Sequence, residues 1–168
     1  CKGIRGMNNE SSFLARFTTG AHLGGIGLEN FEPYLMNRIM GRYNASIRDD
    51  VIKLDLTTAK MRTLAVLSVV NGPMIRDLSV FAVVEQSTLS RSLNALEKDG
   101  MIRREGDEKD TRATRIYLTE IGRTAFEQFW PSMAEAYEKM FQGIEKDDRA
   151  AFLRTLKKML INVRRHEI

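Results

Sequence analysis

The stretch VVEQSTLSRSLNALEKDGMIRR, Val83 to Arg104, predicts a helix with two chemically different faces. At about 3.6 residues per turn, Leu89, Leu93 and Leu96 fall on one side of that helix. The opposite side carries hydrogen-bonding groups and cations, with no acid at its centre: Ser87, Thr88, Ser90, Arg91, Asn94 and Lys98. Such groups contact phosphates and base edges in the major groove of DNA, whereas an ordinary exposed helix mixes Glu with Lys. A half-buried helix that is merely polar outside would show the same pattern, so the neighbouring elements must decide between the two interpretations.

Three helices are predicted before this stretch. Residues 31–54 repeat methionine and aliphatic side chains at intervals of four and three, which is typical of a long helix with one buried face. A second helix begins at Thr57 or Thr58, whose hydroxyl can cap it, and ends before Asn71-Gly72-Pro73. A short third helix spans residues 74–82, with these side chains expected to face inward: Ile75, Leu78 and Phe81.

After Gly100 ends the quoted helix, the periodicity changes to that of strands. MIRRE and TRIYL alternate apolar with polar residues, and the charged loop GDEKDTRA joins them as a hairpin. Thr119 then begins a long helix, in which Pro131 is expected to cause a kink. A last helix spans residues 145–167 and has an apolar side: Phe152, Leu156, Met159, Leu160 and Val163.

This order of elements predicts a winged helix-turn-helix with a helical dimerisation region, a mainly α fold with a small β-hairpin wing (α+β). In that arrangement the second helix of the motif enters the major groove, and the hairpin tip reaches the minor groove beside it. Acids on the outward face would oppose the phosphates, while Arg91 can fork onto a guanine. We expect three regions: a flexible arm (residues 1–30), the dimerisation region (31–56 and 120–168) and the winged helix-turn-helix (57–119).

The composition favours one domain, or one domain with an arm, and gives no support to an enzyme. The net charge is +4, but residues 76–115 contain eight cations and eight acids, so overall basicity does not by itself indicate DNA binding. The single cysteine allows no internal disulfide, and the two histidines lack the spacing of metal ligands. The glycines of TTGAHLGGIG lack the preceding strand that a phosphate-binding loop needs. With no signal peptide or membrane-length apolar run in the sequence, we expect a cytoplasmic protein without cofactor or metal.

Three segments resemble the MarR family of bacterial transcription regulators: LTTAKMRTLAVL, STLSRSLNALEKDGMIRR and the wing DTRATRIYLTEIGR. The wing pattern, Asp-x-Arg followed by Leu-Thr-x-x-Gly, is specific at this distance from the Ser-Thr-x-Ser-Arg helix. The resemblance covers residues 31–163. It implies a dimer held by the first and the last two helices, two winged helices on a near-palindromic double-stranded DNA site, and repression that a small ligand often relieves.

The resemblance also implies roles for individual residues. On the recognition helix, the residues that resemble DNA contacts are Gln86, Ser87, Thr88, Ser90 and Arg91, and Asn94 shares their outward face. On the wing, Arg112 resembles a minor-groove arginine and Asp110 an acid that braces the hairpin. Weaker candidates for phosphate contacts are Lys109, Arg103 and Arg104. The chain departs from the family pattern at Val83 and Glu85, where a glycine and a serine cap are usual.

An effector site is expected where the first, second and fifth helices meet, lined by Arg38, Arg42, Tyr43, Met61 and Trp130. Tyr43 and Trp130 would equally suit a plain apolar core. An arginine beside aromatic side chains suits a small aromatic or acyl acid, because a guanidinium pairs with a carboxylate. An alternative function is a winged helix that binds protein instead of DNA, but such a module would need apolar anchors on the outward face.

Overall fold

The computed structural model describes residues 23–107 and 113–164, and the chain divides into two compact units between Asn44 and Ala45. The first unit holds two short helical turns and most of a longer helix: α2 (Leu23–Ile26), η1 (Leu28–Asn30) and α3 (Glu32–Ser46). Gly27 has a φ of 79° and lets the chain turn between α2 and η1. Residues 23–30 of the predicted arm are therefore helical turns.

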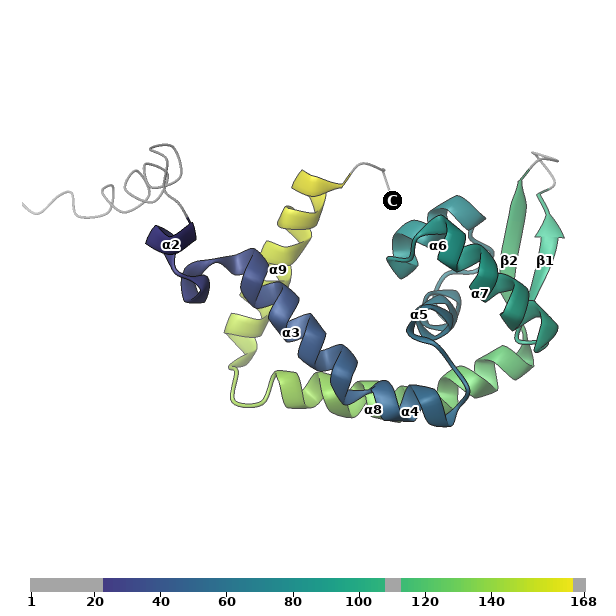
Figure 1. Ribbon diagram of the computed structural model, residues 1–168, viewed down its shortest axis with the longest axis horizontal. Helices are drawn as coiled ribbons and strands as arrows, with labels where there is room; N and C mark the ends of the chain where they lie inside the picture. The colour runs from purple at the N-terminus through teal and green to yellow at the C-terminus, as the bar shows by residue number, and fades with distance from the viewer. Residues whose placement is uncertain (1–22, 108–112, 165–168) are drawn as a thin grey trace, which may run out of the picture. The chain divides into compact units, whose positions relative to one another are not determined.

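The second unit follows the predicted order, with a helix–turn–helix and a hairpin before a long helix (Figure 1). Its elements are α4 (Arg48–Lys53), α5 (Thr58–Leu67), α6 (Ile75–Ala82), α7 (Gln86–Lys98), β1 (Ile102–Gly106), β2 (Thr114–Leu118), α8 (Glu120–Met140) and α9 (Lys146–Val163). The prediction of a mainly helical fold with a two-stranded wing is confirmed.

Helix α5 is the centre of the winged helix-turn-helix core. Thr57 caps its start by accepting a hydrogen bond from the Lys60 backbone N–H at 3.2 Å. The helix packs against α6, α7, α8 and β2, and Figure 1 shows it end-on beside α6 and α7. The side chains that fill this core are fully buried: Leu64, Leu78, Leu89, Leu93, Leu96 and Ile116. Burial of each such side chain contributes about 1.5–3 kcal/mol, so this core dominates the stability of the unit.

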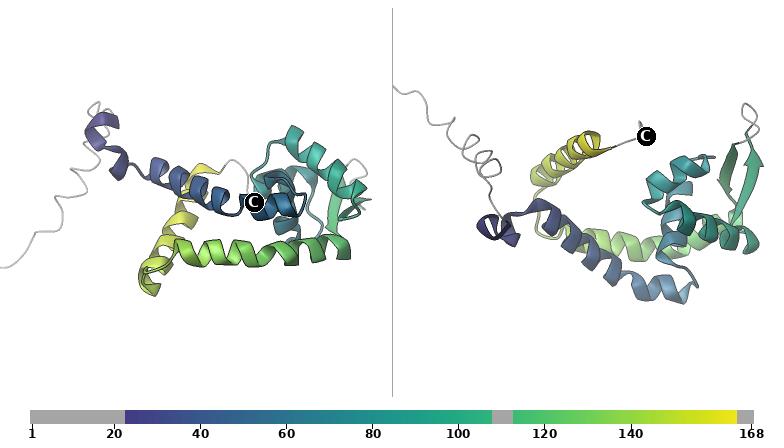
Figure 2. Two further views of the ribbon diagram at one scale, coloured as in Figure 1. Left: turned by 60° about the horizontal axis from the view of Figure 1, so that its bottom comes forward. Right: turned by 45° about the horizontal axis from the view of Figure 1, so that its top comes forward.

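Strands β1 and β2 form an antiparallel hairpin, with Ile102 opposite Leu118 and Arg104 opposite Ile116. Ile102 and Ile116 are buried, so one face of the hairpin closes the core. On the other face, the Arg103 guanidinium lies 4.4 Å from the centre of the Tyr117 ring. The hairpin packs beside α7, as the views in Figure 2 show.

The start of α8 is hydrogen-bonded to the turn that precedes β1. The Thr119 hydroxyl accepts a hydrogen bond from the Gly122 N–H at 3.2 Å and donates to the Gly100 carbonyl at 2.6 Å. The Thr119 backbone N–H donates to the Met101 carbonyl at 3.1 Å. A Cβ at Gly122 would lie 2.0 Å from that same Met101 oxygen. The Leu-Thr-x-x-Gly pattern therefore ties the start of α8 to the base of the hairpin.

Aromatic side chains join the end of α8 to α9. The ring centres of Tyr137 and Phe141 lie 5.2 Å apart, and Phe141 lies 6.4 Å from Phe152 of α9. The Arg149 guanidinium lies 4.8 Å from the Tyr137 ring centre and 4.5 Å from that of Phe141. A hydrogen bond to Tyr137 raises the pKa of Arg149. These contacts hold the start of α9 against the end of α8.

Some details differ from the sequence-based expectations. The helix expected over residues 31–54 is interrupted at Ile47, which has φ −98° and ψ −2° between α3 and α4. Phe81 is 41% exposed and does not face inward, whereas Leu78 and Ala82 are buried. The reason is that positions three apart drift by about 60° per step around a helix, so Ile75, Leu78 and Phe81 do not share one face. Pro131 lies inside α8, as expected, and the kink expected at this residue stays a prediction.

Replacing Gly122 by alanine should lower the free energy of unfolding by about 1–3 kcal/mol, because the new Cβ would push against backbone and not against a flexible side chain. Gly41→Ala is the matched control, since Gly41 lies inside α3 and an added Cβ there meets nothing within 4 Å. That change should raise the free energy of unfolding by about 0.5–1 kcal/mol. Urea unfolding followed by circular dichroism measures both. Equal effects of the two substitutions would contradict close packing at Gly122.

Replacing Val83 by glycine should stabilise the protein. Val83 ends α6 in the left-handed region, with φ 52° and ψ 51°, and is 76% exposed. That conformation costs a β-branched residue about 1–2 kcal/mol, so relief of strain should exceed the entropic cost of glycine and raise the free energy of unfolding by about 0.5–1 kcal/mol. Val69 is 82% exposed and has no positive φ, so Val69→Gly should give no gain in the same urea titration. A loss of stability in both variants would refute strain at Val83.

Candidate nucleic-acid interface

Helix α7 separates a buried face from an exposed face, as its sequence predicts. Leu89, Leu93 and Leu96 have no exposed surface. The expected contact residues lie on the other side, where Thr88 is half-buried and the following are exposed: Gln86, Ser87, Ser90, Arg91 and Asn94. Along α7, which is described from end to end, this outward face carries donors, acceptors and a guanidinium, and it carries no apolar side chain.

The guanidinium of Arg91 rests on its own helix. Its Nε donates to the Ser87 carbonyl at 3.4 Å, and its Nη2 donates to the Thr88 hydroxyl at 3.4 Å. Both distances are near the upper limit for a hydrogen bond, so these bonds are weak and readily exchanged for better acceptors. The O6 and N7 atoms of a guanine, or two phosphate oxygens, are acceptors that match the guanidinium fork.

Helix α5 holds α7 at both of its ends. Before α7 begins, Nη1 of Arg62 donates to the Val83 carbonyl at 3.3 Å. After α7 ends, Nζ of Lys60 pairs with Oδ2 of Asp99 at 3.1 Å, and the Lys60 side chain is only 14% exposed. Together with the buried leucines, these bonds give the outward face of α7 a fixed orientation on the core.

Arg104 of β1 links the hairpin to α7. Its Nη2 donates to Oδ1 of Asn94 at 2.7 Å, and its Nε lies 3.4 Å from Oε2 of Glu97, one turn further along α7. The sequence pattern suggested only a weak phosphate contact for Arg104 and missed this link. A signal was available, because Arg104 follows the buried Ile102 by two residues, and alternation along a strand turns both side chains to the same face.

A buried ion pair holds the base of the wing. Asp107 is 7% exposed, and its carboxylate accepts a hydrogen bond from Nε of Arg115. Nη1 of Arg115 also donates to the Gly72 carbonyl at 2.8 Å, in the turn before α6. An acid therefore braces the hairpin at Asp107, a residue that sequence reasoning had not singled out. Three predicted wing residues lie outside the described residues: Lys109, Asp110 and Arg112.

The candidate effector residues are divided between the two units. In the first unit, Arg38 and Arg42 are exposed, and burial raises the pKa of the half-buried Tyr43. In the second unit, Met61 is buried, whereas Trp130 is 53% exposed. Trp130 is therefore not a core side chain of its unit. Its ring lies 6.0 Å from that of Phe126 on the same helix.

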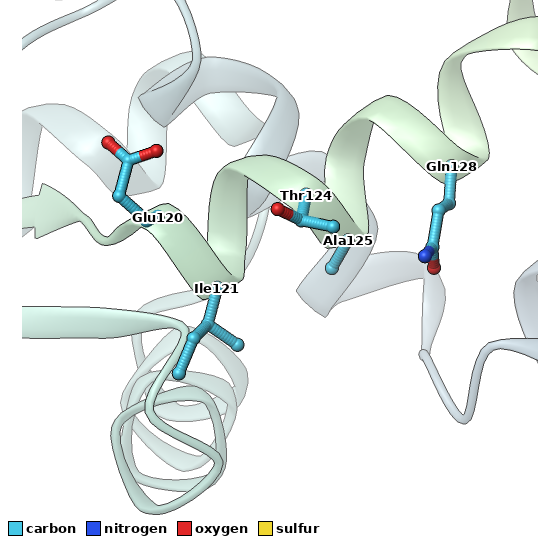
Figure 3. Close-up of a pocket in the computed structure, with 5 residues that line it drawn as sticks. All are labelled: Glu120, Ile121, Thr124, Ala125 and Gln128. Atoms are coloured by element: carbon cyan, nitrogen blue, oxygen red, sulfur yellow. The ribbon is translucent and has the colours of Figure 1, made fainter.

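A shallow hollow of about 420 Å³ lies along α8. Figure 3 shows its lining side chains on successive turns of that helix: Glu120, Ile121, Thr124, Ala125 and Gln128. This lining includes none of the candidate effector residues. A surface formed by one helix encloses a small molecule poorly, whereas ligand sites bury most of the ligand.

The acids of the described part of the hairpin are paired with arginines, Glu105 with Arg103 and Asp107 with Arg115. Across residues 23–107 and 113–164, no three His, Cys, Asp or Glu side chains are grouped so that they could hold a metal ion. In the same two segments, no helix has both the length and the apolar character needed to cross a membrane.

Known proteins resemble this chain in sequence and in fold. The MarR family model matches residues 54–113. A MarR-family transcriptional regulator from Silicibacter pomeroyi, known from its crystal structure, is 55% identical with a TM-score of 0.84, over 88% of this chain and 99% of that chain. The transcriptional repressor IacR of Pseudomonas putida is 26% identical over 116 residues, which are 69% of this chain and 70% of IacR. BpsR of Bordetella bronchiseptica is 23% identical with a TM-score of 0.65, over 76% of this chain and 96% of that chain, and shares the fold. The chain therefore belongs to the MarR family, whose members are DNA-binding transcriptional regulators and not enzymes.

Proposed function

We propose that this protein is a homodimeric, sequence-specific repressor that a small aromatic or acyl acid releases from DNA. In each protomer the outward face of α7 enters the major groove of a near-palindromic site, and the wing lies along the adjacent minor groove. Residues 57–119 supply the DNA contacts, and residues 31–56 with 120–168 supply the dimer contacts. The family membership and the repressor function of IacR support this proposal.

The observation that carries the proposal is the chemistry of the outward face of α7. Its exposed side chains are polar, and the two hydrogen bonds that Arg91 donates to its own helix are both 3.4 Å long. Glu97, the acid nearest to this face, is paired with Arg104, so its charge is offset. Phosphates that approach the middle of this face therefore meet no uncompensated charge from Glu97.

We further assign the base contacts to Gln86, Ser87, Thr88, Ser90, Arg91 and Asn94. The wing contacts would come from Lys109 and Arg112, with Asp110 bracing the loop. The ion pair of Asp107 with Arg115 supports this placement, because it holds the base from which the loop extends. A cation in the minor groove responds to groove width and to phosphate charge more than to base identity.

Exposed apolar side chains support the dimer. On α9 alone, between 45% and 74% of each of these side chains is exposed: Phe152, Leu153, Leu160, Ile161 and Val163. On α3, Leu35, Ile39 and Met40 are each more than a third exposed. Monomeric proteins rarely leave continuous apolar faces of this kind in water. A second copy would bury both faces and would double the number of contacts with DNA.

The effector proposal starts from Arg38, Arg42, Tyr43, Met61 and Trp130. The exposed arginines are able to pair with a carboxylate, and Trp130 offers an exposed ring for an aromatic ligand. The DNA binding of BpsR is regulated by 6-hydroxynicotinic acid, which is a small aromatic acid. We expect the ligand to bind most tightly to an arrangement of the dimer in which the two recognition helices have a spacing that does not fit DNA. Ligand binding then shifts the population of dimers towards that arrangement and away from the one that binds DNA.

Two arginine substitutions test the DNA-binding proposal. Arg91→Ala should cost about 1–3 kcal/mol on an operator selected from random DNA and should flatten the sequence preference, because a base contact is lost. Arg112→Ala should weaken binding to all DNA and lower the slope of log K against log salt by about 1. Fluorescence anisotropy on operator and scrambled duplexes measures both, with Arg154→Ala on α9 as the control for charge.

Identical effects of Arg91→Ala and Arg112→Ala on operator and scrambled DNA would contradict these assignments. If the unmodified protein binds no duplex at low salt, the DNA-binding proposal fails, and the alternative of a protein-binding winged helix replaces it.

Replacing Leu160 by glutamate should shift the dimer towards monomer at micromolar concentrations. Leu160 is 64% exposed on α9, so the change would not disturb the core of a protomer but would bury a charge in the proposed interface. Lys158→Glu, at an exposed position about 160° around the same helix from Leu160, is the control for charge. Light scattering coupled to gel filtration measures the mass. A monomeric unmodified protein, or a Leu160→Glu variant that remains fully dimeric, would exclude α9 from the interface.

Ligand and operator should weaken each other's binding by the same factor, about 5–150-fold. A thermal-shift screen of aromatic and acyl acids, beginning with 6-hydroxynicotinic acid, would identify a ligand. Titration of that ligand with and without operator then gives the coupling. If a ligand stabilises the dimer but leaves operator affinity unchanged, a site exists without a switch, and the release mechanism is wrong.

A further inference from the structure

The hydrogen bond between Arg104 and Asn94 limits what Asn94 can present to DNA. A carboxamide has one carbonyl acceptor and an NH₂ group with two donors. A guanidinium has donors only, so the atom of Asn94 that lies 2.7 Å from Nη2 of Arg104 must be its carbonyl oxygen. Among the described residues nothing accepts a hydrogen bond from the amide nitrogen, so both of its donors can meet a partner outside the protein.

The position of Arg104 is itself fixed by its surroundings. Its side chain is 30% exposed and bridges two successive turns of α7, from Asn94 to Glu97. The Nε atom is shielded from solvent and makes no hydrogen bond among the described residues, so the Glu97 carboxylate at 3.4 Å is the group that offsets its charge. Arg104 therefore belongs to the protein's internal contacts, and it is not free to reach a phosphate without breaking them.

Asparagine normally distinguishes adenine by a two-point contact. Its carbonyl accepts from the N6 amino group of the base, while its NH₂ donates to N7. Here a charge-assisted bond occupies one of the two lone pairs of the carbonyl oxygen and turns that oxygen towards β1, and such bonds are about twice as strong as neutral ones. The NH₂ group on the other side of the amide keeps its two donors, which match acceptors: O6 and N7 of guanine.

We propose that Arg104 is a specificity-determining positioning residue, which turns the Asn94 carbonyl towards β1, leaves its NH₂ group for the base, and shifts the base preference of Asn94 from adenine to guanine. The inference rests on the proposed function, because it requires the outward face of α7 to lie in the major groove. It also couples the hairpin to base recognition, since Arg104 belongs to β1 and Asn94 to α7.

Selection of binding sites from random duplex DNA by the full-length chain is the test. The unmodified protein should enrich guanine at one base pair of each half-site, and Asn94→Ala should remove the preference at that base pair alone. Arg104→Met keeps an aliphatic stem but releases the Asn94 carbonyl. It should raise the preference for adenine over guanine at the same base pair by about tenfold and leave the other positions unchanged.

Arg103→Met is the matched control, because Arg103 is the adjacent residue of β1 and contacts Tyr117 and Glu105 instead of α7. It should leave the selected sequence unchanged while it weakens binding to all DNA. Asn94→Asp is a second variant that keeps both the shape of the side chain and the partner of Arg104. Its carboxylate has acceptors only, so the selected base should become cytosine.

The outcomes separate the inference from the proposed function. If the unmodified protein enriches no sequence, both fail. If it enriches an operator, and Arg104→Met, folded by circular dichroism, enriches the same one with uniformly lower affinity, the inference alone fails. If Arg104→Met does not fold, Arg104→Leu decides, because it also removes every donor at this position: a rise in the preference for adenine supports the inference, and an unchanged base overturns it.

Discussion

The packing of α7 on α5 is the constraint on which the rest of the structure depends. Three leucines of α7 are completely buried, and α5 also holds the chain before and after α7 through Arg62 and Lys60. A helix fixed along one face and at both ends cannot turn about its axis, so its other face is presented in one orientation. The backbone of the polar face therefore needs no ordering when it meets DNA, and less binding energy is lost to conformational entropy.

The wing is attached to the same rigid body by two separate links. The ion pair of Asp107 with Arg115 continues to the Gly72 carbonyl, and Arg104 connects β1 to α7. The glycine at position 72 is needed in this place, since its φ is +64° and a Cβ would meet the Tyr117 ring at 2.6 Å. The recognition helix and the base of the wing thus belong to one packed unit. In the proposed dimer, a change in the spacing of the two recognition helices would have to come from the helices outside this unit.

Local patterns in the sequence were enough to predict the winged fold, the two faces of α7 and a threonine cap at position 57 or 58, because periodicity and capping depend on residues a few positions apart. Contacts between elements were not predictable in this way. Lys60 and Asp99 are 39 residues apart, and nothing in either helix alone indicates that they meet. Phe81 was assigned to the wrong face because two successive steps of three residues turn it about 120° around the helix from Ile75. Arg104 was judged by its charge, whereas its role follows from the strand face that it shares with Ile102.

The central claim is that the outward face of α7 contacts base edges in the major groove, once in each protomer. Methylation protection of guanine N7 on the selected operator tests it most directly, since N7 is exposed only in the major groove. The account predicts two clusters of protected guanines with centres about 10 base pairs apart, one helical turn, and loss of protection within each cluster in the Arg91→Ala variant. A bound operator with no protected guanine N7, or with a single cluster, would contradict it.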